Sequence, residues 1–171
     1  MIKTQIKMVL GLVMVISAIM FVVAISAKPE KEDFVLIMER YPCHGNCQAY
    51  QLTIHSDGTV YYSGYSNVRE YDNVVTKITD TQVKQILQEI KNSKIFSENR
   101  GCCQIDVVDV AGVSFEITMN GDTAFATYPI HDEVPEELRR MECAIDQVIG
   151  SKKWIGRNFL CEGVLSESPL P

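Results

Sequence analysis

Residues 50–65 read YQLTIHSDGTVYYSGY and carry the clearest structural signal in the chain. Polar and apolar side chains alternate strictly over residues 50–55, which is typical of a strand with one buried face. Asp57 and Gly58 follow, and glycine accepts the positive φ angle that a tight turn demands. Residues 59–65 return as a tyrosine-rich strand. The stretch therefore predicts a β-hairpin.

Further strands are predicted on both sides of this hairpin. Residues 34–38 form a continuous apolar run of strand length. Residues 113–119 and 123–128 flank the dipeptide Asn120-Gly121, which is another strong hairpin turn. Hairpins join neighbouring strands in an antiparallel manner, so we expect an antiparallel sheet.

Two helices are predicted between and after the hairpins. Thr79 and Gln82 match a capping box, and the apolar residues that follow recur at helical spacing, which predicts a helix over residues 80–93. A second helix is predicted to start around Pro135, because two glutamates come next and an apolar stripe follows. Residues 154–171 have no such pattern and are predicted to be irregular.

The order of elements is strand, hairpin, helix, hairpin, helix. It predicts an α+β fold, in which an antiparallel sheet of about five strands carries both helices on one face. This domain is expected over residues 34–156. Residues 28–33 are a polar linker before it, and residues 157–171 are an irregular tail after it.

The N-terminal segment is apolar. Residues 8–27 are twenty uncharged, almost wholly apolar positions, preceded by Lys3 and Lys7. As a helix this run spans about 30 Å, which matches the hydrocarbon core of a bilayer. The lysines favour a cytoplasmic N-terminus. We therefore expect residues 1–27 to be a membrane anchor with the C-terminal domain outside the cytoplasm. The alternative is a cleaved signal peptide, which gives a periplasmic or secreted domain.

The domain after this segment is acidic. Residues 28–171 contain 14 Lys and Arg residues against 22 Asp and Glu residues, a net charge of −8. An acidic domain without basic clusters is a poor match for nucleic acid or an anionic membrane surface. The expected partners are therefore the membrane, through residues 8–27, and an envelope protein or cell-wall component.

All six cysteines lie in the part that is predicted to be exported. An even number of cysteines in an oxidising compartment indicates disulfides, although the pairing stays open. A bond between the adjacent Cys102 and Cys103 is strained, so each is expected to pair elsewhere or stay a thiol. Helix phase predicts that Cys143 faces outward, and a Cys143–Cys161 bond that holds the tail is our hypothesis. The disulfide candidates are Cys43, Cys47, Cys102, Cys103, Cys143 and Cys161.

The cysteine-containing segment before the first hairpin resembles a family of exported bacterial proteins classed as a domain of unknown function. The core of that family is a strand, the motif Cys-x-Gly-x-Cys-Pro-x-Tyr, a second strand, an Asp-Gly turn and a Tyr/Gly-rich strand. The resemblance covers about residues 34–156 and implies the fold and export, without an established activity. Gln48 stands where the family has proline, and the Cys102-Cys103 pair is a further departure. The matching residues are Cys43, Gly45, Cys47, Tyr50, Asp57, Gly58, Val60, Tyr62 and Gly64.

No motif for catalysis, phosphate binding or dinucleotide binding is present, so no catalytic residue and no cofactor is predicted. His131 is interpreted as part of a solvated turn. Asp106 and Asp109 would point to opposite faces of a strand, which does not suit paired acid–base chemistry.

The Cys43 to Cys47 spacing allows three interpretations. The favoured one is structural disulfide bonding, because Gly45 lets the loop turn tightly. The alternatives are a thiol-redox centre or a metal site in which His44 and His55 join the two cysteines, provided that the thiols stay reduced.

Tyrosines concentrate along the first hairpin and its exit. The favoured interpretation is packing of the rings against neighbouring strands of the sheet. The alternative is a binding surface, because the tyrosine ring is rigid and its hydroxyl forms hydrogen bonds. Of the two functions that the sequence leaves open, we favour a non-catalytic binding module that presents an open sheet face. A small exported thiol-redox or metal-binding enzyme is the alternative. The candidate binding residues are Tyr61, Tyr62, Tyr65 and Tyr71.

Overall fold

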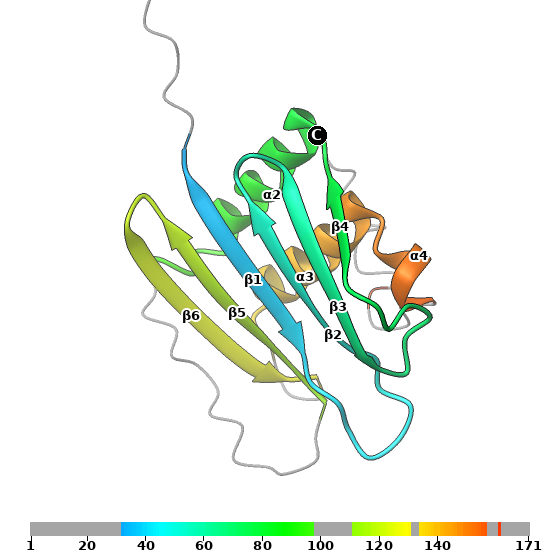
Figure 1. Cartoon of the computed structure of the whole chain (residues 1–171). Helices are drawn as coiled ribbons and strands as arrows, with labels where there is room; N and C mark the ends of the chain where they lie inside the picture. Colours follow the sequence, from blue (N-terminus) through cyan, green and yellow to red (C-terminus); the bar gives the residue numbers. More distant parts are fainter. Residues whose placement is uncertain (1–31, 98–110, 131–133, 157–160, 162–171) are drawn as a thin grey trace, which may run out of the picture. The chain divides into compact units, whose positions relative to one another are not determined.

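A computed structural model gives the architecture of the domain (Figure 1). Most of the predicted linker, the predicted anchor or signal segment and most of the tail lie outside the described residues. Within the described part of the chain, no helix is long and apolar enough to cross a membrane. The described residues are 32–97, 111–130, 134–156 and 161.

The described residues form one six-stranded antiparallel sheet in the order β4-β3-β2-β1-β5-β6. The antiparallel sheet is confirmed, and it has one strand more than the expected five. The extra strand is β4, which has only four residues and is too short for alternation to reveal it. The strands are β1 (Phe34–Arg40), β2 (Ala49–His55), β3 (Thr59–Ser66), β4 (Val74–Lys77), β5 (Gly112–Met119) and β6 (Asp122–Pro129).

Three helices accompany the sheet in the described residues. The two predicted helices are confirmed as α2 (Asp80–Asn92) and α3 (Glu136–Ile149), and both lie on the same face of the sheet (Figure 1). The short helix α4 (Lys152–Ile155) corrects the expectation that the chain is irregular from residue 154. A single turn of helix is too short to give a periodic sequence pattern.

The predicted helix start and hairpin turns are present. Thr79 and Gln82 form the capping box at the start of α2. Gly58 has a φ angle of +86°, and its carbonyl accepts a 2.9 Å hydrogen bond from the Ile78 amide. In the β5–β6 hairpin, Asn120 and Gly121 have φ angles of 53° and 93°, as the type I′ turn requires.

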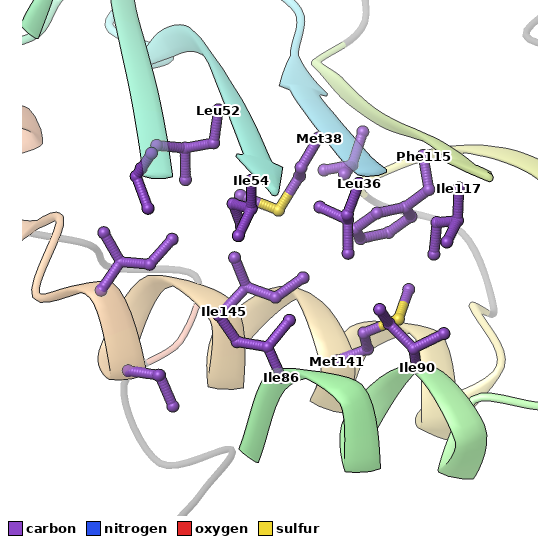
Figure 2. Packing of buried hydrophobic residues seen from close by; sticks show 14 of the residues in the cluster. Leu36, Met38, Leu52, Ile54, Ile86, Ile90, Phe115, Ile117, Met141 and Ile145 are labelled. Atoms are coloured by element: carbon purple, nitrogen blue, oxygen red, sulfur yellow. The ribbon is translucent and has the colours of Figure 1, made fainter. Parts of the chain in front are cut away.

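The core lies between the sheet and the helices (Figure 2). Alternate residues of the strands point into it, and the apolar stripes of α2 and α3 pack against them. Burial of each such side chain contributes roughly 1.5–3 kcal/mol of transfer free energy. The residues in Figure 2 that illustrate this contact are Leu36, Met38, Leu52, Ile54, Ile86, Ile90, Phe115, Ile117, Met141 and Ile145.

Candidate binding face

One face of the sheet carries α2 and α3, and we call the other the open face. It consists of the outward side chains of all six strands. In β1 the burial alternates strictly, with the side chains of Phe34, Leu36, Met38 and Arg40 buried and the intervening ones partly exposed. Because side chains alternate across a strand, the inward set forms the core and the outward set forms the open face.

The strand register places six outward residues in one line across the sheet, and we call them the central row. Each is the direct cross-strand partner of the next, so their side chains lie side by side. The row has large exposed side chains near both of its ends, where Val75 is 63 % exposed, Tyr61 is 46 % exposed and Phe125 is 57 % exposed. The central row runs Val75, Tyr61, Thr53, Ile37, Glu116, Phe125.

The outward positions on both sides of the central row are mostly uncharged polar residues. The Thr118 and Thr123 hydroxyls lie 2.9 Å apart, and the Tyr41 hydroxyl donates a 2.8 Å hydrogen bond to Ser114 Oγ. The charged outward side chains of the described strands are Glu39, Glu116 and Lys77. The uncharged polar positions beside the row are Gln51, Thr59, Ser63, Ser114, Thr118, Thr123 and Thr127.

The structure divides the four predicted binding tyrosines. Tyr61 and Tyr65 lie on the open face of β3, and Tyr71 is exposed in the connection to β4. The prediction that Tyr62 lies on the binding face is wrong, because the alternation of the strand turns it inward and it is fully buried. Its ring stacks on Trp154, with the ring centroids 5.0 Å apart, and its hydroxyl donates a hydrogen bond to the Glu70 carbonyl. Burial raises the pKa of Tyr62 to about 12.

The loop between β1 and β2 is closed by a Cys43–Cys47 disulfide. Gly45 has a φ angle of +143°, which residues other than glycine rarely adopt. Asn67 Nδ2 donates to the carbonyl oxygens of Gly45 and Cys47 at 3.1 and 3.0 Å, which holds the loop against the end of β3. This geometry is that of a structural crosslink.

The structure does not bring together the four residues of the alternative metal or thiol-redox site, which are Cys43, His44, Cys47 and His55. Cys43 and Cys47 use both of their sulfurs in the disulfide. His55 is at the opposite end of β2 from the loop, about 20 Å away at the usual rise per residue of a strand. Its ring instead packs edge-on against Tyr61 at 5.6 Å. Within the described residues, no group of His, Cys, Asp and Glu side chains is arranged to hold a metal ion.

The other candidate residues lie outside the described part of the chain. They are Cys102, Cys103, Asp106, Asp109 and His131.

A buried ion cluster fixes the end of the sheet that carries the cysteine loop. The guanidinium of Arg40 is completely buried, with Nη2 2.5 Å from Glu142 Oε1 and 3.1 Å from Asp146 Oδ2. Both carboxylates project from one side of α3, because they are four positions apart. The Arg40 cluster therefore connects the central strand to the helix layer.

Hydroxyl groups complete the cluster around the two carboxylates. Tyr50 and Ser151 donate to Asp146 at 2.6 Å each, and Tyr128 donates to Glu142 at 2.7 Å. Burial raises the pKa of Glu142, against the opposing effect of the Arg40 charge. Burial also raises the pKa values of Tyr50 and Tyr128, so both phenols stay protonated as donors.

The Arg40 cluster was not predicted from the sequence, although a signal was present. Arg40 continues the inward alternation of β1 after Phe34, Leu36 and Met38. Glu142 and Asp146 lie at helical spacing next to the apolar stripe of α3. A charge at an inward strand position, with carboxylates beside a helix stripe, indicates a buried ion pair.

Cys143 and Cys161 are joined by the second disulfide, as our hypothesis expected. The expectation that Cys143 faces outward is wrong, since it is only 1 % exposed. The reason is that α3 is covered on more than its sheet side. Cys161 lies over it, and the Sγ of Cys161 is 3.6 Å from Arg40 Nη2.

Comparison with known families identifies the domain. Residues 34–149 match the family described as Domain of unknown function (DUF6438), and this match covers more than half of the chain. The chain belongs to this family. Among curated proteins, none matches the chain.

The DUF6438 match begins at Phe34 and ends at Ile149. It contains all six strands, the helices α2 and α3 and the Arg40–Glu142–Asp146 ion pairs. It does not contain α4 or Cys161. The disulfide partner of Cys143 is therefore supplied by a segment beyond the family match.

Proposed function

We propose that this domain is a non-catalytic binding module that presents the open face of its sheet to a partner outside the cytoplasm. The observation that carries the proposal is the central row, where Val75, Tyr61 and Phe125 are exposed on a face that α2 and α3 leave uncovered. Large exposed apolar side chains that gather on one face are a mark of interaction surfaces.

The location outside the cytoplasm rests on two features. The Cys43–Cys47 and Cys143–Cys161 bonds suit an oxidising compartment, because disulfides rarely persist in the cytosol. The apolar run over residues 8–27 has the length and flanking lysines of an anchor or export signal. Bacterial export and the role of the Cys-x-Gly-x-Cys motif as a family feature belong to the same proposal.

The cysteine loop has a supporting role in this proposal. It is closed by a disulfide and tied to Asn67, so it stiffens the connection between two neighbouring strands of the face. Its removal is expected to lower stability by roughly 2 kcal/mol, with little direct effect on binding.

Site-specific photo-cross-linking tests the proposal. A photoreactive residue is placed at Phe125 on the open face or, as the matched control, at the exposed Gln88 on α2. We expect the Phe125 position to yield a discrete adduct that disappears when Tyr61→Ser is added, and the Gln88 position to yield none. Equal adducts at both positions, or none at Phe125, would contradict the proposal.

A further inference from the structure

We infer that the open face binds an uncharged polysaccharide chain, laid across the strands along the central row. This inference rests on the proposed function and names the class of its partner. It follows from the chemistry of the outward side chains, the length of the row and the charge of the domain.

The side-chain chemistry of the open face combines rings with hydroxyl and amide groups. A sugar ring has an apolar C–H face and a rim of hydroxyl groups. Tyr61 and Phe125 offer flat apolar surfaces that complement the C–H face, and the tyrosine hydroxyl adds a polar contact. Thr53 and Glu116, between them in the row, offer a hydroxyl and a carboxylate to sugar hydroxyl groups.

The length of the row indicates a chain instead of a single sugar. Tyr61 and Phe125 are separated by four strand spacings, or about 19 Å at the usual distance between paired strands. Val75 extends the row by one more strand. A monosaccharide cannot contact both aromatic rings, whereas an extended oligosaccharide of several units can.

The charge of the domain disfavours anionic polymers. The carboxylates of the open face are Glu39 and Glu116, and its basic side chains at the described outward positions are Lys77 on the edge strand β4 and His55 on β2. Residues 28–171 carry a net charge of −8. Like charges would therefore repel an acidic polysaccharide, a nucleic acid or an anionic lipid surface.

The same charges argue against a second copy of the chain as the occupant. Two copies packed face to face would bring the carboxylates of Glu39 and Glu116 against a surface of the same sign. The apolar residues of the row are also interrupted by Thr53 and Glu116, whereas sheets that pack on each other have continuous apolar inner faces.

Native gel electrophoresis of the full chain in gels that contain a polysaccharide tests the inference. The neutral probes are hydroxyethylcellulose, a galactomannan and glycol chitin, and carboxymethylcellulose is the charged counterpart of the first. We expect at least one neutral polymer to retard the protein and carboxymethylcellulose to have no such effect. Failure of all three neutral polymers would overturn the inference.

Variants locate the binding to the central row. The double variant Tyr61→Ser with Phe125→Ser is expected to weaken retardation about tenfold or more, because it removes both aromatic rings that contact the sugar units. Gln88→Ser is the control, because Gln88 is exposed on α2 and lies outside the open face. Circular dichroism and thermal unfolding confirm that each variant folds. Retardation that the double variant leaves unchanged would also overturn the inference.

The outcomes separate this inference from the proposed function. If the Phe125 photo-cross-linker captures a protein in a Tyr61-dependent manner while no neutral polymer binds, the polysaccharide inference fails and the binding module stands. If sedimentation velocity finds a dimer that Phe125→Ser dissociates, a second copy is the occupant and the inference fails. If neither polymer nor adduct is found, both proposals fail.

Discussion

Arg40 Nη2 lies 3.1 Å from Asp146 Oδ2, and this ion pair joins the central strand β1 to α3 across 106 positions of the chain. A second contact of the same nitrogen, to Glu142, gives one buried cation two carboxylate partners. Breaking a buried pair is costly because it leaves an uncompensated charge out of water. The first two predictions follow from this arrangement.

Arg40→Met is expected to lower the free energy of unfolding by about 3–5 kcal/mol, because Glu142 and Asp146 lose their counter-charge while they stay buried. Urea denaturation measures the change. Adding Glu142→Gln to Arg40→Met should recover part of the loss, since it removes one of the orphaned charges. A single variant that unfolds at the wild-type urea concentration would contradict a structural role for the cluster.

The pKa of Glu142 predicts a pH dependence of stability. Burial raises this pKa above its ordinary value of 4.5, so the folded state holds the proton more tightly than the unfolded state. The stabilising contribution is present below pH 4.5 and is lost as the pH rises through the folded-state pKa. The difference in unfolding free energy between wild type and Glu142→Gln should therefore fall from pH 4 upward.

Denaturant unfolding of both proteins at several pH values measures this difference. Subtraction of the two curves cancels the titration of the other carboxylates, provided that they do not contact residue 142. A difference that grows with pH would mean that the attraction of Arg40 outweighs burial, and it would refute the stated direction of the pKa shift.

The two disulfides are predicted to differ in their contributions to stability. Cys143 and Cys161 are 18 residues apart and Cys43 and Cys47 only 4 apart, so the Cys143–Cys161 bond restricts the unfolded chain more. Replacing Cys143 and Cys161 by alanine should cost about 3 kcal/mol, and replacing Cys43 and Cys47 by alanine should cost about 2 kcal/mol. Thermal unfolding under non-reducing conditions ranks the two double variants, and the reverse order would contradict the prediction.

Gly58→Ala is expected to be more destabilising than Gly121→Ala. Both glycines have positive φ angles, +86° and +93°, which cost an alanine about 1–2 kcal/mol. At Gly58 a Cβ atom would also lie 2.6 Å from the Ile78 carbonyl oxygen, whereas at Gly121 nothing lies within 4 Å. The steric overlap should add about 1–3 kcal/mol. Urea denaturation compares the two variants. Equal losses would contradict the prediction, because they would mean that Ile78, after β4, moves away from the added methyl group at no cost.

Much of the fold follows from local sequence signals. The Asp57-Gly58 and Asn120-Gly121 turns and the Thr79–Gln82 capping box each specify their structure within a few residues. Strand β4 and helix α4 escaped prediction because four residues cannot establish a period. Contacts with distant segments stabilise them instead. In α4, for example, the Trp154 carbonyl accepts hydrogen bonds from the backbone amides of Arg69 and Glu70.

The candidate site was predicted only in part, because its composition depends on the strand register. Tyrosines near the first hairpin were visible in the sequence, and Tyr61 and Tyr65 are indeed outward. Phe125 belongs to the same row through β5 and β1, a relationship between distant segments that no local pattern contains. The prediction that Cys143 faces outward was wrong for a similar reason, since Cys161, from near the end of the chain, covers it.

The position of β1 has a mechanical consequence. This first strand lies in the middle of the sheet, bonded on both sides to β2 and β5 over its length. A pulling force that acts on Phe34 along the axis of β1 would load both ladders of hydrogen bonds in shear at once. The ladders would have to rupture together instead of opening one bond at a time, so β1 resists such a force more strongly than an edge strand would.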